Sequence, residues 1–180
     1  MLDPIEFDPV DSIATGAIGI PGQRRFMIQA TKNGARLAVL LEKEQIALFA
    51  IEAGQFLDGL DLPDEHGLDP VNDALCGQVA DVEPLFRARV IGIGYDPARE
   101  LVLIELRESS PDEIDPATGE RSDASDPSEP DGHVARLYAT RAQVRALTRH
   151  GAASVERGRP PCPLCQGPMD PEGHRCPRWN

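Results

Sequence analysis

Aromatic residues are scarce in this chain of 180 residues, where phenylalanine, tyrosine and tryptophan together account for 4%. Proteins that bind single-stranded nucleic acids stack bases on such side chains, so the shortage argues against that function. Basic residues are also outnumbered, and the formal net charge is −12. Because a negative surface repels phosphate backbones, nucleic acid is a disfavoured partner.

Long apolar runs are missing as well. No run approaches the roughly 20 residues that a membrane-spanning helix needs. The first nine residues are acidic and contain neither the basic start nor the apolar stretch of a secretory signal. We therefore expect a cytoplasmic protein without a membrane partner, in a reducing compartment that disfavours disulfides.

Recognisable catalytic and nucleotide-binding motifs are not found in the sequence. Gly92-Ile93-Gly94 resembles the start of a phosphate-binding loop, but neither a third glycine nor a helix follows. The four histidines stand in no recognisable triad motif with a nucleophile. A protein without catalytic activity is therefore favoured over an enzyme, and the question stays open.

The last nineteen residues contain three of the four cysteines, at a spacing typical of metal sites. Cys162 and Cys165 form a C-x-x-C pair, and His174 and Cys176 follow after a spacer rich in glycine and proline, which suits a hairpin. One C-x-x-C pair can hold an ion from a single tight turn, and a second pair completes a tetrahedron. The spacing predicts a structural Zn²⁺ site with Cys162, Cys165, His174 and Cys176 as ligands. Four protein ligands leave no open position for a substrate.

Alternatives to this zinc site remain open. The fourth ligand could instead be His150, Cys76 or water, and the C-x-x-C pair could be a redox dithiol or a disulfide. Redox pairs normally open a helix after a strand, whereas three prolines crowd this pair. The crowding by prolines is more compatible with a closed structural metal site than with a redox pair.

Charge and composition divide the chain into an α+β body over residues 1–157 and a zinc-binding tail over residues 158–180. From Val134 to the end of the chain, eight arginines outnumber three acidic residues, although the whole chain is acidic. Segment 109–132 is acidic, rich in proline and poor in apolar surface, so we expect a mobile loop there. The body divides further into a first half (1–59), an acidic connector (60–84) and a second half (85–157) that contains this loop.

The apolar pattern of the body indicates strands and then a helix, and it does so twice. Apolar positions alternate with polar ones over residues 24–31, and they recur every three or four residues over residues 43–57. Asn33-Gly34 and Asp96-Pro97 mark hairpin turns. Strands are predicted over residues 12–19, 24–31, 35–41, 86–94, 100–108 and 133–139, and helices over residues 43–57 and from Thr140 onward. We expect an α+β fold in which both helices cover one face of an antiparallel sheet of about six strands.

The two halves align at a shift of 98 residues, which places residues 42–46 on residues 140–144. Thr140 and Gln143 have the spacing of a capping box at a helix start. A tandem βββα repeat would explain the alignment. Capping alone can also make two helix starts alike, so the sequence leaves both explanations open.

A second candidate site lies near the first predicted helix. Arg24 and Arg25 follow a Pro-Gly turn and could clamp a phosphate or carboxylate. Glu42, Lys43 and Gln45 stand where a helix N-terminus leaves backbone N–H groups free for a ligand. The ordinary alternatives are a solvated hairpin tip and a capped helix whose acidic residues complement its dipole.

The motifs together resemble an uncharacterised actinobacterial protein family, a domain of unknown function. The motifs that carry the resemblance are Gly19-Ile20-Pro21-Gly22-Gln23-Arg24, Leu41-Glu42-Lys43-Glu44-Gln45, the CPLC segment at residues 162–165 and Gly173-His174-Arg175-Cys176-Pro177-Arg178. The resemblance implies a zinc-ribbon-like tail. It also implies a gene trio with a histidine-phosphatase-like and a lipid-kinase-like protein, but it implies no activity.

Three functions follow from these observations. The first is a zinc-containing adaptor or protein-interaction module, whose partners could be the products of neighbouring genes. The second is a protein or enzyme that binds a small molecule or phosphate near Arg24, Arg25 and residues 42–45. The third is nucleic-acid binding through the arginine-rich tail, which the acidic body disfavours.

Overall fold

A computed structural model describes residues 3–60, 62–63, 67–108, 132–157, 162–169 and 173–179. The predicted mobile loop at 109–132 lies almost entirely outside these ranges. In the described part of the chain, no helix is both long and apolar enough to cross a membrane. The elements are, in order, β1 (Ile5–Phe7), β2 (Ser12–Ile18), β3 (Arg25–Lys32), β4 (Ala35–Leu41), α1 (Lys43–Asp58), α2 (Pro70–Leu75), β5 (Phe86–Arg87), β6 (Val90–Asp96), β7 (Leu101–Arg107), β8 (Val134–Ala139) and α3 (Arg141–Glu156).

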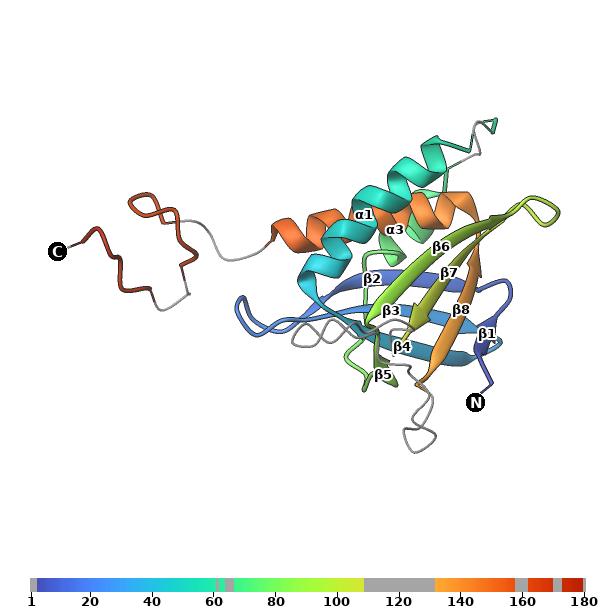
Figure 1. The fold of residues 1–180 in the computed structure, drawn as a ribbon, viewed down its shortest axis with the longest axis horizontal. Coiled ribbons are helices and arrows are strands. Elements are labelled where there is room, and N and C mark those ends of the chain that lie inside the picture. The colour runs from blue at the N-terminus through green and yellow to red at the C-terminus, as the bar shows by residue number, and fades with distance from the viewer. Residues whose placement is uncertain are drawn as a thin grey trace, which may run out of the picture.

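The strands form two four-stranded sheets with the orders β1-β8-β7-β6 and β2-β3-β4-β5 (Figure 1). The α+β class is confirmed, and the single sheet of about six strands is wrong. The chain breaks the predicted strand at 86–94 into two pieces: β5 pairs in parallel with β4, and β6 pairs antiparallel with β7. The short strand β1, which the sequence did not predict, joins the other sheet in parallel with β8.

Each half of the chain builds an antiparallel meander followed by a helix, β2-β3-β4-α1 and β6-β7-β8-α3. Each sheet takes its fourth, short strand from the other half. Apart from the broken strand, the predicted boundaries agree with the structure to within one residue. The recurring element order is what a tandem repeat requires, and duplication itself stays a prediction.

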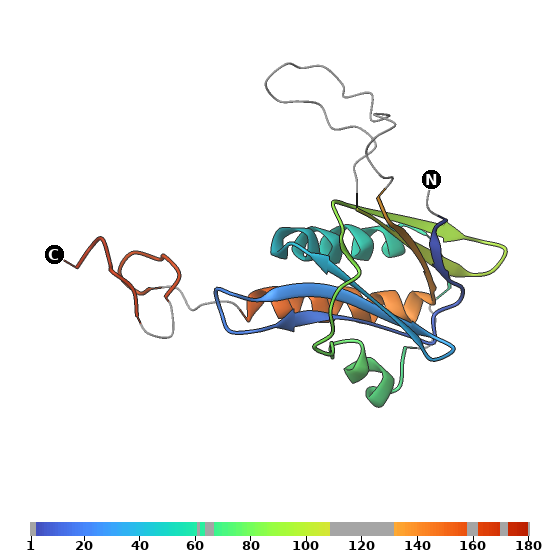
Figure 2. The same cartoon turned by 90° about the horizontal axis from the view of Figure 1, so that it is seen from below.

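The core lies where the inner faces of both sheets meet α1 and α3, which run side by side (Figures 1 and 2). Inward residues alternate along β7, where Val102, Ile104 and Leu106 are fully buried. Gly151 of α3 faces both α1 and β2: a Cβ there would make ordinary van der Waals contacts, at 3.4 Å from Ile46 of α1 and 3.5 Å from Thr15 of β2. Burial of each large apolar side chain stabilises the body by about 1.5–3 kcal/mol.

Both long helices begin with a capping box. Thr140 Oγ1 accepts a hydrogen bond from the Gln143 backbone N–H, and Gln143 Oε1 accepts one from the Thr140 N–H. Glu42 and Gln45 make the same reciprocal arrangement at α1. The capping box predicted at Thr140 is confirmed, and each cap satisfies backbone donors that the helix leaves unpaired.

The acidic connector covers the outer face of the β2-β3-β4-β5 sheet (Figure 2). The side-chain amide of Gln29 donates to the Ala80 carbonyl at 2.6 Å and accepts from its N–H at 2.9 Å. The N–H of Thr15, at the edge of the sheet, donates to the Cys76 carbonyl. The connector also contains the short helix α2, whose apolar residue Val71 is 69% exposed.

Candidate metal centre

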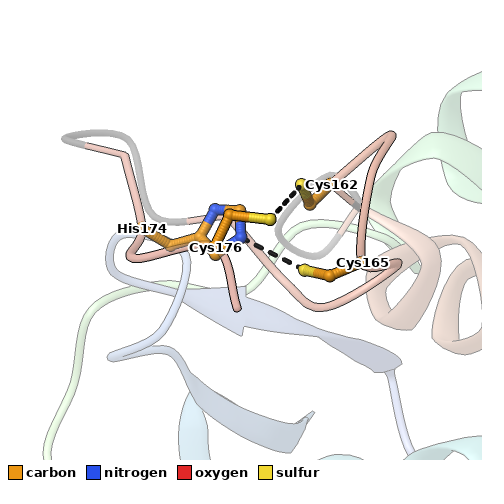
Figure 3. Close-up of side chains that lie close together, drawn as sticks. All are labelled: Cys162, Cys165, His174 and Cys176. Atoms are coloured by element: carbon orange, nitrogen blue, oxygen red, sulfur yellow. Dashed lines mark hydrogen bonds between the residues drawn. The ribbon is translucent and has the colours of Figure 1, made fainter. Parts of the chain in front are cut away.

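Tight turns in the tail bring Cys162, Cys165, His174 and Cys176 together (Figure 3). The N–H of Gln166 donates to the Cys162 carbonyl, and Gln166 has a positive φ of 61°, so the chain reverses directly after the C-x-x-C pair. Gly173, with φ of 93°, precedes His174 in a conformation that glycine adopts without strain. In Figure 1 the tail extends beyond the end of α3.

The four side chains offer donor atoms that all lie within 4.8 Å of one another. The Sγ atoms of Cys162 and Cys176 are 3.9 Å apart, and Cys165 Sγ lies 3.3 Å from His174 Nε2. A tetrahedral ion with Zn–S bonds of about 2.3 Å and a Zn–N bond of about 2.0–2.1 Å requires S···S separations of about 3.8 Å and S···N separations of about 3.6 Å. The donor set and its spacing therefore fit a four-coordinate metal ion.

Backbone N–H groups support the thiolates. The N–H groups of Cys165 and Leu164 point at Cys162 Sγ, and they lower the pKa of that thiol. Burial raises the pKa of Cys176, as do the neighbouring sulfurs of Cys165 and Cys162. When three cysteine sulfurs lie this close together, either they share protons or a bound cation neutralises the negative charge of their thiolates.

The outside of the tail is apolar and basic. Trp179, the single tryptophan of the chain, is 79% exposed, and Leu164 is 47% exposed. The Arg178 guanidinium donates to the Leu164 carbonyl at 3.1 Å, and Trp179 N–H donates to the Cys176 carbonyl at 3.0 Å. These bonds tie the last residues to both cysteine turns, so the position of Trp179 depends on the metal-ligand loops.

The second candidate site is spread over several internal contacts. Arg25 Nη2 lies 2.7 Å from Asp81 Oδ1, and Arg24 is half-buried in the β2–β3 turn. Glu42 caps α1 and pairs with Arg87, while Lys43 is exposed as the first residue of α1. Gln45 Nε2 donates to the Ala88 and Arg89 carbonyls, and Gln45 lines a cavity of about 240 Å³ between α1 and β6. The structure thus accounts for Arg25, Glu42 and Gln45 by their contacts within the fold.

A polar cluster between α2 and α3 was missed by the sequence analysis. Arg145 and Arg149 of α3 line a cavity of about 440 Å³ together with Asp73 of α2. Asp73 accepts from Arg149, which lowers the pKa of its carboxyl group, and lies 3.3 Å from His150 Nε2. Arginines at four-residue spacing in α3 were the available signal. Their carboxylate partners are more than 70 residues away in sequence, so the pairing could not be read from it.

Comparison with known proteins identifies the family. A search of curated proteins and a search of solved structures each gave no match. A family model described as "Protein of unknown function (DUF3090)" matches residues 5–176, which include the body and all four clustered ligands. The chain therefore belongs to the DUF3090 family of proteins of unknown function.

Proposed function

We propose that this chain is a zinc-containing, non-catalytic protein-interaction module. In the proposal, Cys162, Cys165, His174 and Cys176 hold one structural Zn²⁺. Thiolate and imidazole donors suit Zn²⁺, whereas Mg²⁺ and Ca²⁺ prefer oxygen. A closed set of four protein ligands leaves no site for a substrate, so the ion stabilises the tail and performs no chemistry.

Trp179 is 79% exposed on the metal-bearing tail, and this exposure is the main support for an interaction role. Tryptophan and arginine are enriched among the residues that dominate protein–protein binding. Leu164 and Arg178 lie beside one another on the same tail. A tail of this size has no core of its own, so a bound ion would hold these side chains in a fixed arrangement before a partner binds.

The proposed partners are proteins encoded beside members of the family. We infer from the resemblance of the motifs that these are a histidine-phosphatase-like and a lipid-kinase-like protein of an actinobacterial gene trio. Arg178 and Leu164, which lie beside one another on the tail, favour a partner surface that combines acidic and apolar groups.

Binding of the purified full chain to each purified trio protein tests the proposal. Isothermal titration calorimetry of the zinc-loaded chain should detect binding to at least one of them. Trp179→Ala should weaken that binding at least tenfold, and Leu164→Ala should weaken it less. Leu75→Ala is the matched control, because Leu75 is 46% exposed on α2, close to the 47% exposure of Leu164.

Two results would refute the interaction role of the tail. One is the absence of binding to both trio proteins by the zinc-loaded chain. The other is binding that Trp179→Ala and Leu75→Ala leave equally intact, since the partner would then contact another surface.

A further inference from the structure

The two sheets have four edge strands, and three of them are protected. β1 has three residues and β5 has two, so neither is long enough to form a hydrogen-bonded ladder with another strand. β2 is covered, because Thr15 N–H donates to the Cys76 carbonyl and α3 packs against the strand. β6 is different: it has seven residues, it is the outermost strand of its sheet, and it contains neither a proline nor a charged residue before Asp96. Natural sheets rarely leave such an edge unpaired.

The backbone groups that face outward from β6 can be identified from the register. Glu108 N–H donates to the His133 carbonyl and continues the register of β7 with β8. In an antiparallel ladder, alternate residues bond to opposite neighbours, so the odd-numbered residues of β7 bond to β6. Their partners in β6 are the even-numbered residues from Val90 to Asp96. The N–H and C=O groups of Ile91, Ile93 and Tyr95 therefore point away from the sheet, and no described residue hydrogen-bonds to them there.

A groove with an apolar centre runs along this edge. The cavity of about 240 Å³ between α1 and β6 is lined by Leu48, Phe49 and Ala53 of the helix and by Ile91 and Ile93 of the strand, and its other lining residues include Gln45, Glu52 and Arg89. Leu48 is 55% exposed and Ile51, three residues further along α1, is 59% exposed. Figure 1 shows α1 alongside β6 at this side of the molecule. Backbone donors and acceptors beside apolar side chains are the features of a strand-pairing surface.

We propose that a second copy of this chain covers the edge, by antiparallel pairing of β6 with β6 about a twofold axis at Ile93. The strand is self-complementary in that register. Ile93 faces Ile93 of the other copy, Ile91 faces Tyr95, and Gly92 faces Gly94. The outward groups form hydrogen-bonded pairs, each of which exchanges two N–H···O bonds. The two four-stranded sheets become one continuous sheet of eight strands.

The charges are compatible with this register. Asp96 of one copy faces the uncharged Val90 of the other, so no two like charges face each other along the strand. Leu48 lies over Ile91 and Ile93, close to the axis, so the Leu48 side chains of the two copies meet across the seam. The dimer is an isologous interface, in which the same patch serves both chains.

Sedimentation velocity of the full chain, from low micromolar to several hundred micromolar, tests the proposal. The wild type should change from monomer to dimer as its concentration rises. Leu48→Glu should raise the dissociation constant about tenfold or more, because it buries a charge at the seam. Ile20→Glu is the matched control: Ile20 is 60% exposed in the β2–β3 turn of the other sheet, and its substitution should leave the constant unchanged.

Amide hydrogen exchange of the wild type gives a second readout that does not depend on a variant. Exchange at Ile91, Ile93 and Tyr95 should slow as the dimer forms, while Gly92 and Gly94 stay protected at every concentration by their bonds to β7. A chain that remains monomeric throughout would overturn the proposal and would leave the groove to a different partner. A dimer in which these three amides exchange at an unchanged rate, or which Ile20→Glu weakens as much as Leu48→Glu, would overturn it as well.

Discussion

The body and the tail are stabilised by different means. The body buries a continuous set of apolar side chains from both sheets and both long helices. In the described part of the tail, Cys162 is the one buried residue, and its position reflects the clustered ligands rather than an apolar core. The body can therefore fold by hydrophobic burial alone, whereas in the proposed account a bound ion holds the turns of the tail.

Under the proposed function, this difference separates the part of the chain that provides stability from the part that provides recognition. A short segment with no core becomes ordered when four ligands converge on one ion, and it can then present an exposed tryptophan that a hydrophobic core would bury. If the two parts are energetically independent, a change in one should leave the other intact. The predictions below test that independence in order of decreasing effect.

Cys165→Ser should abolish stoichiometric zinc binding, because one thiolate of the four-ligand set is lost. The tail should lose its order, while the thermal unfolding of the body stays unchanged. Elemental analysis and calorimetry of the same sample measure both effects. Cys76→Ser is the matched control: Cys76 is 4% exposed in the body, so this variant should keep the zinc and lower body stability by about 1–3 kcal/mol. Zinc loss in Cys76→Ser would place that thiol among the ligands.

Leu147→Ala should destabilise the body by about 2–5 kcal/mol, because Leu147 of α3 is fully buried and its truncation leaves a cavity. Denaturant unfolding followed by circular dichroism measures the change. The zinc content of the folded protein should stay at the wild-type value. A parallel loss of zinc would mean that the tail depends on the packing of α3.

Gly77→Ala should destabilise the body by about 1–3 kcal/mol. A Cβ at Gly77 would lie 2.4 Å from His150 Nδ1, so the imidazole must move and its contact with Asp73 is lost. Gly54→Ala serves as the control, because a Cβ there meets nothing within 4 Å and alanine favours a helix by up to about 1 kcal/mol. Equal stability of both variants would contradict this role of Gly77. Unchanged zinc content in Gly77→Ala would also support the assignment of His150 to the body rather than to the metal.

Glu105→Gln should cost the body about 1 kcal/mol at neutral pH, since the arginines that pair with Glu105 are partly exposed. Burial acts to raise the pKa of Glu105, but hydrogen bonds from Arg136 and Arg107 outweigh it and lower the pKa below its ordinary value. The stabilisation is therefore present above the ordinary glutamate pKa and is lost as the pH falls through the lowered, folded-state pKa. Unfolding curves of both proteins at a series of pH values should converge at the acidic end. A constant difference across that range would contradict the assignment.

The long elements were predictable because their signals are local. Alternation identified β3, neighbouring turn signals delimited β2, β4 and β7, a period of three to four identified α1, and a capping box marked the start of α3. β1 and β5, with three and two residues, are too short to show a period. Their parallel pairing with distant strands is a tertiary contact, and it is what divides the strands into two sheets.

The same distinction holds for the candidate sites. The metal ligands lie within fifteen residues of one another in sequence, so their spacing alone predicted that Cys162, Cys165, His174 and Cys176 would come together. Arg25 and Glu42 stood out in the sequence, but their ionic partners Asp81 and Arg87 lie 56 and 45 residues away. The ion pairs with these partners explain why Arg25 and Glu42 are charged. Partners this far apart in sequence cannot be inferred from a local pattern.

X-ray absorption at the zinc edge of the purified full chain tests the central claim most directly. The account predicts one zinc per chain, with three sulfur neighbours at about 2.3 Å and one nitrogen neighbour at about 2.0–2.1 Å. A shell that contains oxygen in place of nitrogen, a fourth sulfur, or protein that binds no zinc when zinc is supplied would contradict it.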